Sequence, residues 1–265
     1  MSKARACAAV RLSRAAFYRR PTGQAGDGPV IDALNGVVER YPRWGFWKCY
    51  GRLRLEGYPW NHKRVWRVYR AMRLNLPRRT KRRVPPRQRH TLEVPRQVNA
   101  IWSLDFMSDA LYHGRRFRTL NVLDEGVREA LDIVIDTSLP SGRVVRTLEQ
   151  LRLWRGTPKA IRCDNGPELC ATPFVRWCEA NRVEIRYIQP GKPNQNAFIE
   201  RFNRTYRDEV LDLYLFESLE EVHQVTSRWL RTYNEKRPHD ALGGLPPAVV
   251  RERLQREVST SELST

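Results

Sequence analysis

The chain has 265 residues, 41% of them hydrophobic, which is enough for one catalytic domain and a smaller module with a buried core. Its five cysteines include no Cys-x-x-Cys pair and its five histidines lie far apart, which argues against a disulfide framework and against a zinc module. The longest apolar run near the start, Ala6–Val10, is short and lies between arginines, so we expect a cytoplasmic protein with neither a signal peptide nor a membrane span.

The positive charge is concentrated in the first third of the chain. The formal net charge is +19; residues 1–96 contain 24 Lys and Arg against 5 Asp and Glu, whereas residues 97–265 contain 24 of each kind. Such a segregated basic block is typical of binding to a polyanion, because each Lys or Arg placed on a phosphate releases counterions. A solvated basic tail is the alternative interpretation.

Short helices are expected in this basic region. Helical spacing of apolar residues predicts them over Val30–Val38, Tyr50–Leu55 and His62–Met72. Asn61 is placed to cap the last of these, and Gly57 separates it from the helix before. The pair resembles a helix-turn-helix whose second helix, with Lys63, Arg64 and Arg67, lies in a DNA groove. A small basic bundle that only spaces the domains is the alternative.

A basic, proline-rich segment over residues 77–95 predicts a linker. It divides the chain into a basic helical DNA-binding region with a helix-turn-helix-like module, residues 1–76, and a catalytic core, residues 96–252. We expect residues 253–265 to form a flexible tail.

Downstream of the linker the pattern changes to strands. Apolar runs predict strands over Ala100–Met107, Phe117–Leu123, Ala130–Asp136, Ala160–Cys163 and Val183–Ile188. Helices are expected to begin near Ser141, with Trp154 in its core stripe, and near Thr172. The order of three strands, then helix, strand, helix, strand and helix is a mixed α/β layer, as found in ribonuclease H-like folds.

Two aspartates lie on these strands. Asp105 is in the middle of the first, and Asp164 follows the strand Ala160–Cys163, at the carboxyl edge where open α/β sheets hold ligands. Burial of a lone carboxylate costs several kcal/mol or raises its pKa, so a salt bridge or a metal is the usual resolution. Each aspartate alone is equally consistent with a cap, a turn or an ion pair.

Glu200 is the third candidate acid. It lies on a predicted helix whose core stripe consists of Ile199, Phe202, Tyr206, Val210 and Leu213. Glu200 is at the edge of that stripe, and Arg204 and Arg207 lie one and two turns further along the helix. We expect Glu200 to face the sheet edge while the arginines meet phosphates. An ordinary helical ion pair between Glu200 and Arg204 is the alternative.

Three carboxylates at one sheet edge would repel one another unless cations neutralise them. Oxygen ligands without Cys or His suit Mg²⁺ or Mn²⁺, and two such ions can assist an in-line displacement at phosphorus. The acids therefore predict a site for two divalent ions and phosphoryl transfer at DNA phosphodiesters.

The three acids, with 35 residues between Asp164 and Glu200, resemble the D-D-E signature of transposases and retroviral integrases. The surroundings of the acids carry the resemblance further. The matching segments are Trp102–Phe106, Asp164–Glu168, Gly191–Ala197, Glu200–Thr205, Tyr233–Asn234 and Arg237–His239.

The chain is most similar to the downstream-frame proteins of bacterial insertion sequences, which have an integrase-like core. This resemblance implies a ribonuclease H-like fold, Asp105, Asp164 and Glu200 as metal ligands, and strand cleavage and transfer at the ends of an element. We expect Lys192, Asn196, Arg204 and Arg207 to contact DNA. The resemblance also implies a partner protein from an upstream frame, a homo-oligomer on DNA and association with the nucleoid.

Some positions depart from the family pattern. Val127 precedes Arg128 where the family has Ser-Arg, Leu169 replaces an aromatic residue, and Gly244 and Pro246 interrupt the closing motif. None of them removes a predicted metal ligand. The sequence leaves three alternatives open: a non-catalytic DNA-binding relic, a nuclease of the same fold, and a structural scaffold.

Overall fold

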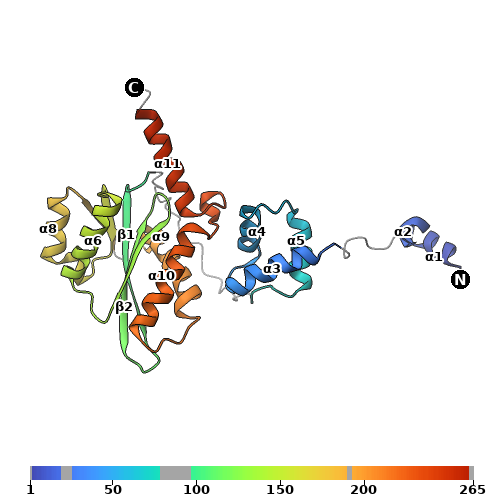
Figure 1. Ribbon diagram of the computed structural model, residues 1–265, viewed down its shortest axis with the longest axis horizontal. Helices are drawn as coiled ribbons and strands as arrows, with labels where there is room; N and C mark the ends of the chain where they lie inside the picture. The colour runs from blue at the N-terminus through green and yellow to red at the C-terminus, as the bar shows by residue number, and fades with distance from the viewer. Residues whose placement is uncertain (1, 19–25, 78–96, 190–192, 263–265) are drawn as a thin grey trace. The chain divides into compact units, whose positions relative to one another are not determined.

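The computed structural model describes residues 2–18, 26–77, 97–189 and 193–262 (Figure 1). The chain divides into two compact units, Met1–Pro77 and Arg78–Thr265. Each unit has its own hydrophobic core. In the part of the chain that the structure describes, no helix is long and apolar enough to cross a membrane.

The first unit is helical. Its helices are α1 (Lys3–Ala9), α2 (Arg14–Tyr18), α3 (Gly28–Arg40), α4 (Phe46–Leu55) and α5 (His62–Ala71). The last three pack around one core in which Leu34, Cys49 and Val65 have almost no exposed surface. Each of these three helices has one apolar face, which is the pattern that a small helical core requires.

A sharp turn separates α4 from α5. Gly57 has a φ of +89°, a left-handed conformation that favours glycine, and the turn ends at Asn61. The Asn61 side-chain oxygen accepts a hydrogen bond from the Lys63 backbone N–H at 2.8 Å and so caps α5. The turn, the cap and α5 are where the sequence pattern predicts them, whereas α4 begins at Phe46 and not at the predicted Tyr50.

The second unit is built on a five-stranded sheet. The strands are β1 (Ile101–Ala110), β2 (Arg116–Asp124), β3 (Glu129–Asp136), β4 (Ala160–Cys163) and β5 (Glu184–Tyr187). Their order is β3-β2-β1-β4-β5; the first three are antiparallel neighbours, whereas β4 is parallel to both β1 and β5. This mixed sheet with flanking helices is the predicted ribonuclease H-like fold.

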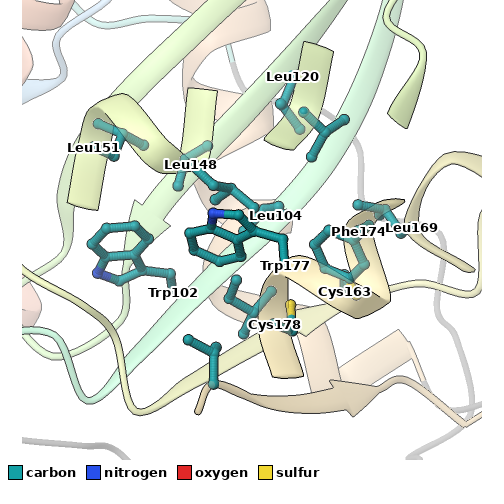
Figure 2. Close-up of a cluster of buried hydrophobic side chains, with 14 of the residues drawn as sticks. Trp102, Leu104, Leu120, Leu148, Leu151, Cys163, Leu169, Phe174, Trp177 and Cys178 are labelled. Atoms are coloured by element: carbon teal, nitrogen blue, oxygen red, sulfur yellow. The ribbon is translucent and has the colours of Figure 1, made fainter. Parts of the chain in front are cut away.

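Helices cover both faces of the sheet (Figure 1). One face packs against α6 (Ser141–Arg155), α7 (Pro167–Cys170) and α8 (Thr172–Ala180). In Figure 2 the indoles of Trp102 and Trp177 lie in this layer beside Leu104 and Leu148. Since side chains alternate along a strand, Trp102 and Leu104 of β1 face this layer, and Ser103 and Asp105 face the other.

The opposite face packs against the carboxyl-terminal helices. These are α9 (Ala197–Tyr206), which follows the short helix η1 (Pro193–Asn196), and α10 (Leu219–Glu235). A π-helical turn, η2 (Arg207–Leu211), extends α9. A short turn η3 (Asp240–Leu242) then leads to α11 (Pro247–Glu262), whose helix continues through residues 253–262, within the stretch expected from the sequence to be a flexible tail.

Two apolar positions differ from the sequence prediction. Trp154 is 86% exposed, because α6 turns Val144, Leu148 and Leu151 inward and leaves Trp154 well to one side of that stripe. Leu213 is partly exposed, because the π-helical turn changes the register and buries Val210 and Leu211.

Candidate active site

Asp105 lies in the middle of β1 on the face that α9 covers. Its side chain is half-buried. One carboxylate oxygen, Oδ1, accepts a hydrogen bond from the Phe106 backbone N–H at 2.9 Å. The other, Oδ2, accepts one from the side-chain amide of Asn203, on α9, at 2.7 Å. Strand and helix therefore hold the carboxylate together.

Asp164 follows β4, the strand next to β1. The parallel register pairs Ser103 with Arg162, and Asp105 and Asp164 each lie two residues further along the chain from this pair. The Asp164 side chain is exposed, and its Oδ1 accepts a hydrogen bond from the Gly166 backbone N–H at 3.0 Å. Asp164 thus lies at the edge of the sheet beside the strand that carries Asp105.

Glu200 is in the first turn of α9, three residues before Asn203. Its side chain is exposed to solvent, whereas Ile199 and Phe202 of the same helix are buried. The sequence pattern puts Glu200 at the edge of the packed face, and in the structure it is on the solvent side of that edge.

The charges of Asp164 and Glu200 act on Asp105. Burial, together with the negative charges of Asp164 and Glu200, raises the pKa of Asp105 to about 6, although the two hydrogen bonds that Asp105 accepts lower it. In the described residues, however, no three His, Cys, Asp or Glu side chains form a group that could hold a metal ion. In the structure the charges of Asp164 and Glu200 therefore affect Asp105, but the three side chains do not form a metal coordination shell.

The donor chemistry fits a hard divalent cation. Three carboxylates supply only oxygen ligands, which Mg²⁺ and Mn²⁺ prefer. A cation would also offset the repulsion that raises the pKa of Asp105.

The predicted DNA contacts of the second unit differ in their surroundings. Arg204 is exposed. Asn196 is buried, and its side-chain oxygen has no hydrogen-bond partner among the described residues. Arg207 is bound to the sheet: it forms an ion pair with Asp109 at 3.1 Å and donates a hydrogen bond to the Ser108 carbonyl at 3.0 Å. Lys192 lies outside the described residues.

The predicted DNA contacts of the first unit lie on α5. Lys63 is exposed. Arg64 and Arg67 both bind the carboxylate of Asp27, just before α3, at 3.1 Å and 2.7 Å. Asp27 is buried, so this pair of arginines joins α5 to the start of α3. Such a contact gives Arg64 and Arg67 a structural task in addition to any role toward DNA.

Comparisons with known proteins place the chain in a family. Two models described as integrase core domain match residues 95–193 and 181–247. A 39.2 kDa protein of insertion element IS476 from Xanthomonas euvesicatoria is 38% identical over 248 residues, 94% of this chain and 72% of the relative. A 31.7 kDa protein of insertion element IS407 from Burkholderia multivorans is also 38% identical, over 94% of this chain and 90% of the relative.

The chain belongs to the integrase-core family of insertion-element proteins. This confirms the transposase or integrase function that the sequence motifs predict, which is cleavage and transfer of DNA strands. Among solved structures, the integrase catalytic core of HTLV-2 is similar at 17% identity, over 61% of this chain and 99% of that one, with a TM-score of 0.45.

Two of the departures from the family pattern, Val127 and Leu169, lie in the packing of the integrase core. Val127 and Leu169 are both fully buried, and Leu169 belongs to the layer of Figure 2. Arg128 donates a hydrogen bond to the Glu125 carbonyl and lies 3.5 Å from the centre of the Phe198 ring. These residues contribute to the core and to the packing of α9.

Two polar networks beside the acids are absent from the sequence prediction. In one, Arg162 of β4 forms an ion pair with the buried Glu125 at 3.0 Å and donates a hydrogen bond to the Gln195 carbonyl at 2.8 Å. In the other, the Asn203 amide that binds Asp105 is itself bound by Asn121 of β2. The only available signal was the polar Asn121 within an apolar strand, and nothing in the pattern connects it with a helix 82 residues away.

Proposed function

We propose that this chain is a metal-dependent D-D-E transposase that cleaves and joins DNA at the ends of an insertion element. Asp105, Asp164 and Glu200 would hold Mg²⁺ or Mn²⁺, with two ions expected. The observation that carries the proposal is the half-buried Asp105, whose pKa is raised by burial and then by the charges of both other acids, on the sheet of an integrase-core protein. The bound metal would supply Lewis-acid stabilisation of the charge that develops at the phosphodiester.

The residues around the acids would position the reacting groups. Asn203 and the Phe106 backbone N–H orient the Asp105 carboxylate from two sides. The Gly166 N–H does the same for Asp164. Arg204, exposed one turn after Glu200, would bind a DNA phosphate close to the acids. Reaction geometry of this kind lowers the barrier by fixing orientation before the chemical step.

The two units would divide the work. We propose that the basic unit, residues 1–76, binds DNA through Lys63, Arg64 and Arg67, that residues 77–95 link it to the catalytic core of residues 96–252, and that 253–265 follow as a tail. Lys192, Asn196 and Arg207 would add contacts near the acids; Arg207 would have to exchange its bond to Asp109 for a phosphate. We also propose that the protein forms a homo-oligomer on DNA and binds a partner protein encoded by an upstream frame. Because its substrate is DNA, the protein would be associated with the nucleoid.

The test compares the purified chain with Asp105→Asn and Glu200→Gln on labelled element ends in Mg²⁺ or Mn²⁺. We expect the wild type to give cleaved and joined products, and each variant to lose at least about 100-fold in rate, since each lacks a metal ligand. Glu184→Gln is the matched control, because Glu184 is an exposed acid of β5 whose ion pair is formed with its strand neighbour Arg186.

Equal processing by the wild type and both acid variants would contradict the proposed mechanism. Cleaved products without joined products would instead indicate a nuclease of the same fold. Absence of any metal-dependent product from all proteins, with DNA binding retained, would indicate a non-catalytic DNA-binding protein.

A further inference from the structure

We infer that Asn121, acting through Asn203, is a positioning residue for Asp105. Asn121 lies on β2, Asn203 on α9 and Asp105 on β1, so the series of hydrogen bonds joins three elements of the second unit. The inference rests on the proposed function, in which Asp105 is a metal ligand.

The hydrogen bonds form a continuous series. The Asn121 side-chain amide donates to the Asn203 side-chain oxygen at 2.7 Å. The Asn203 amide donates to Asp105 Oδ2, also at 2.7 Å. Asn121 is directly opposite Asp105 in the antiparallel ladder of β1 and β2, so both side chains point to the same face of the sheet, beneath α9.

The carboxylate of Asp105 determines which group donates in each of these hydrogen bonds. An ionised carboxylate only accepts hydrogen bonds, so Asn203 has to present its NH₂ group to Asp105. The oxygen of Asn203 then points the other way, where it needs a donor, and Asn121 is the residue that provides one. Removal of that donor leaves the Asn203 oxygen without this hydrogen bond, so the Asn203 amide loses its support from β2 and holds Asp105 less rigidly.

Asn121 is buried, and its side chain donates its hydrogen bond to Asn203. Its side chain has no exposed surface, and its own Oδ1 has no hydrogen-bond partner among the described residues. A buried polar atom without a partner is unfavourable, and leucine has a similar size without that penalty. We therefore infer that the Asn121 amide is useful for its hydrogen bond to Asn203, which in turn binds Asp105.

The same hydrogen bonds leave room for a cation. Oδ1 of Asp105 accepts from the Phe106 N–H and Oδ2 accepts from Asn203, so each carboxylate oxygen keeps a further lone pair. Hydrogen bonds from outside a metal site that orient its ligands are typically worth about 10–100-fold in metal affinity or activity.

The experiment measures Mn²⁺ affinity of the full-length chain without DNA, by electron paramagnetic resonance of free Mn²⁺, for Asn121→Leu, Asn203→Leu and the double variant. We expect each single variant to bind about 10-fold more weakly. Because the two residues act in series, we expect the double variant to bind no more weakly than Asn203→Leu alone. Thermal unfolding of the metal-free proteins is measured in parallel, and the double variant should stay folded, since it replaces both partners of a hydrogen bond with apolar groups.

The matched control is Thr119→Val. Thr119 lies two residues before Asn121 on the same face of β2, is equally buried, and also has a side-chain oxygen without a partner among the described residues. Since its hydroxyl is not part of the series that ends at Asp105, we expect its replacement to leave the Mn²⁺ affinity unchanged.

Asp105→Asn distinguishes a failure of this inference from a failure of the proposed function. If Asp105→Asn loses Mn²⁺ binding while Asn121→Leu binds as the wild type does, the inference about Asn121 is wrong and the proposed function stands. If the fold-losses in Mn²⁺ affinity of the two single variants multiply in the double variant, Asn121 and Asn203 act independently, and the inference is also wrong. If Asp105→Asn binds Mn²⁺ as tightly as the wild type, the proposed function itself fails.

Discussion

At the scale of single residues, the half-buried Asp105 has two opposite effects. Its carboxylate is removed from water and lies near two other acids, which is unfavourable for the folded chain without metal. The same charge is what a divalent cation would bind. Residues of this kind are typical of functional sites, where a cost in stability accompanies a gain in activity.

Because the buried charge of Asp105 is unfavourable without metal, we expect Asp105→Asn to stabilise the metal-free chain at neutral pH. The folded-state pKa of about 6 lies above the ordinary value of 3.8, so the folded chain binds the proton more tightly and its stability falls as the pH rises from about 4 to about 6. The full shift corresponds to at most about 3 kcal/mol. Urea unfolding at pH 4 and pH 7.5, with a chelator present, measures the effect.

We expect Asp105→Asn to exceed the wild type in free energy of unfolding at pH 7.5 and to lose this advantage at pH 4, where the wild-type carboxyl is protonated. An advantage of equal size at both pH values would show that the charge of Asp105 is not its cause.

At the scale of elements, α9 has to be held at a defined position along its own axis so that Glu200 and Asn203 lie near Asp105. Its buried stripe of Ile199, Phe202 and Tyr206 fixes its face, but apolar contacts alone allow some sliding. The bond from Arg162 of β4 to the Gln195 carbonyl fixes the point at which the helix begins. At its other end, the Tyr206 hydroxyl is hydrogen-bonded to Thr226 of α10 at 2.8 Å.

Arg162→Met should therefore destabilise the second unit strongly. Burial raises the pKa of Glu125, whereas the Ser103 hydroxyl and the charge of Arg162 lower it, so removal of the arginine leaves a carboxylate with no exposed surface and no close cation of equal strength. Loss of one partner of a buried ion pair typically costs about 3–5 kcal/mol. Urea unfolding gives the value.

The double variant Glu125→Leu with Arg162→Met is the control, because it removes both charges. We expect it to recover part of the lost stability, since the uncompensated charge is gone. A double variant that is less stable than Arg162→Met would refute this explanation and leave the bond to Gln195 as the main contribution of Arg162.

At the scale of the whole molecule, the excess positive charge and the three candidate catalytic acids lie in different parts of the sequence. Residues 97–265, which contain the three acids, have as many acidic as basic residues, while residues 1–96 have the entire excess of positive charge. Most of the electrostatic affinity for DNA is therefore expected from the first part of the chain.

Lys63→Ala tests this division. Lys63 is exposed in the first turn of α5, so its removal should weaken DNA binding without a change in thermal stability. Removal of one cation that binds a phosphate should reduce the slope of log Kd against log salt concentration by about 1. Fluorescence anisotropy with a labelled duplex, repeated over a salt series, measures that slope.

Arg176→Ala is the matched control in the second unit, because Arg176 lies on α8, on the side of the sheet away from α9. Its salt slope should equal that of the wild type. If Arg176→Ala changes the slope as much as Lys63→Ala does, the DNA affinity is not concentrated in the basic unit.

The sequence alone was sufficient to predict the order of the five strands and the ribonuclease H-like fold, because strand runs, helix spacing and caps are local signals. The family was predicted from the resemblance of the segments around the three acids, whereas α1, α2 and α11 were not predicted. The sequence also placed Asp105 on one strand of the sheet and Asp164 at the carboxyl end of another. The tertiary structure decided which polar groups meet. Arg207 binds Asp109, and Asn121 reaches Asp105 through Asn203. Local periodicity specifies which face of an element a residue occupies, but its partner on that face depends on how distant elements pack, and so only the folded chain shows what holds Asp105 in place.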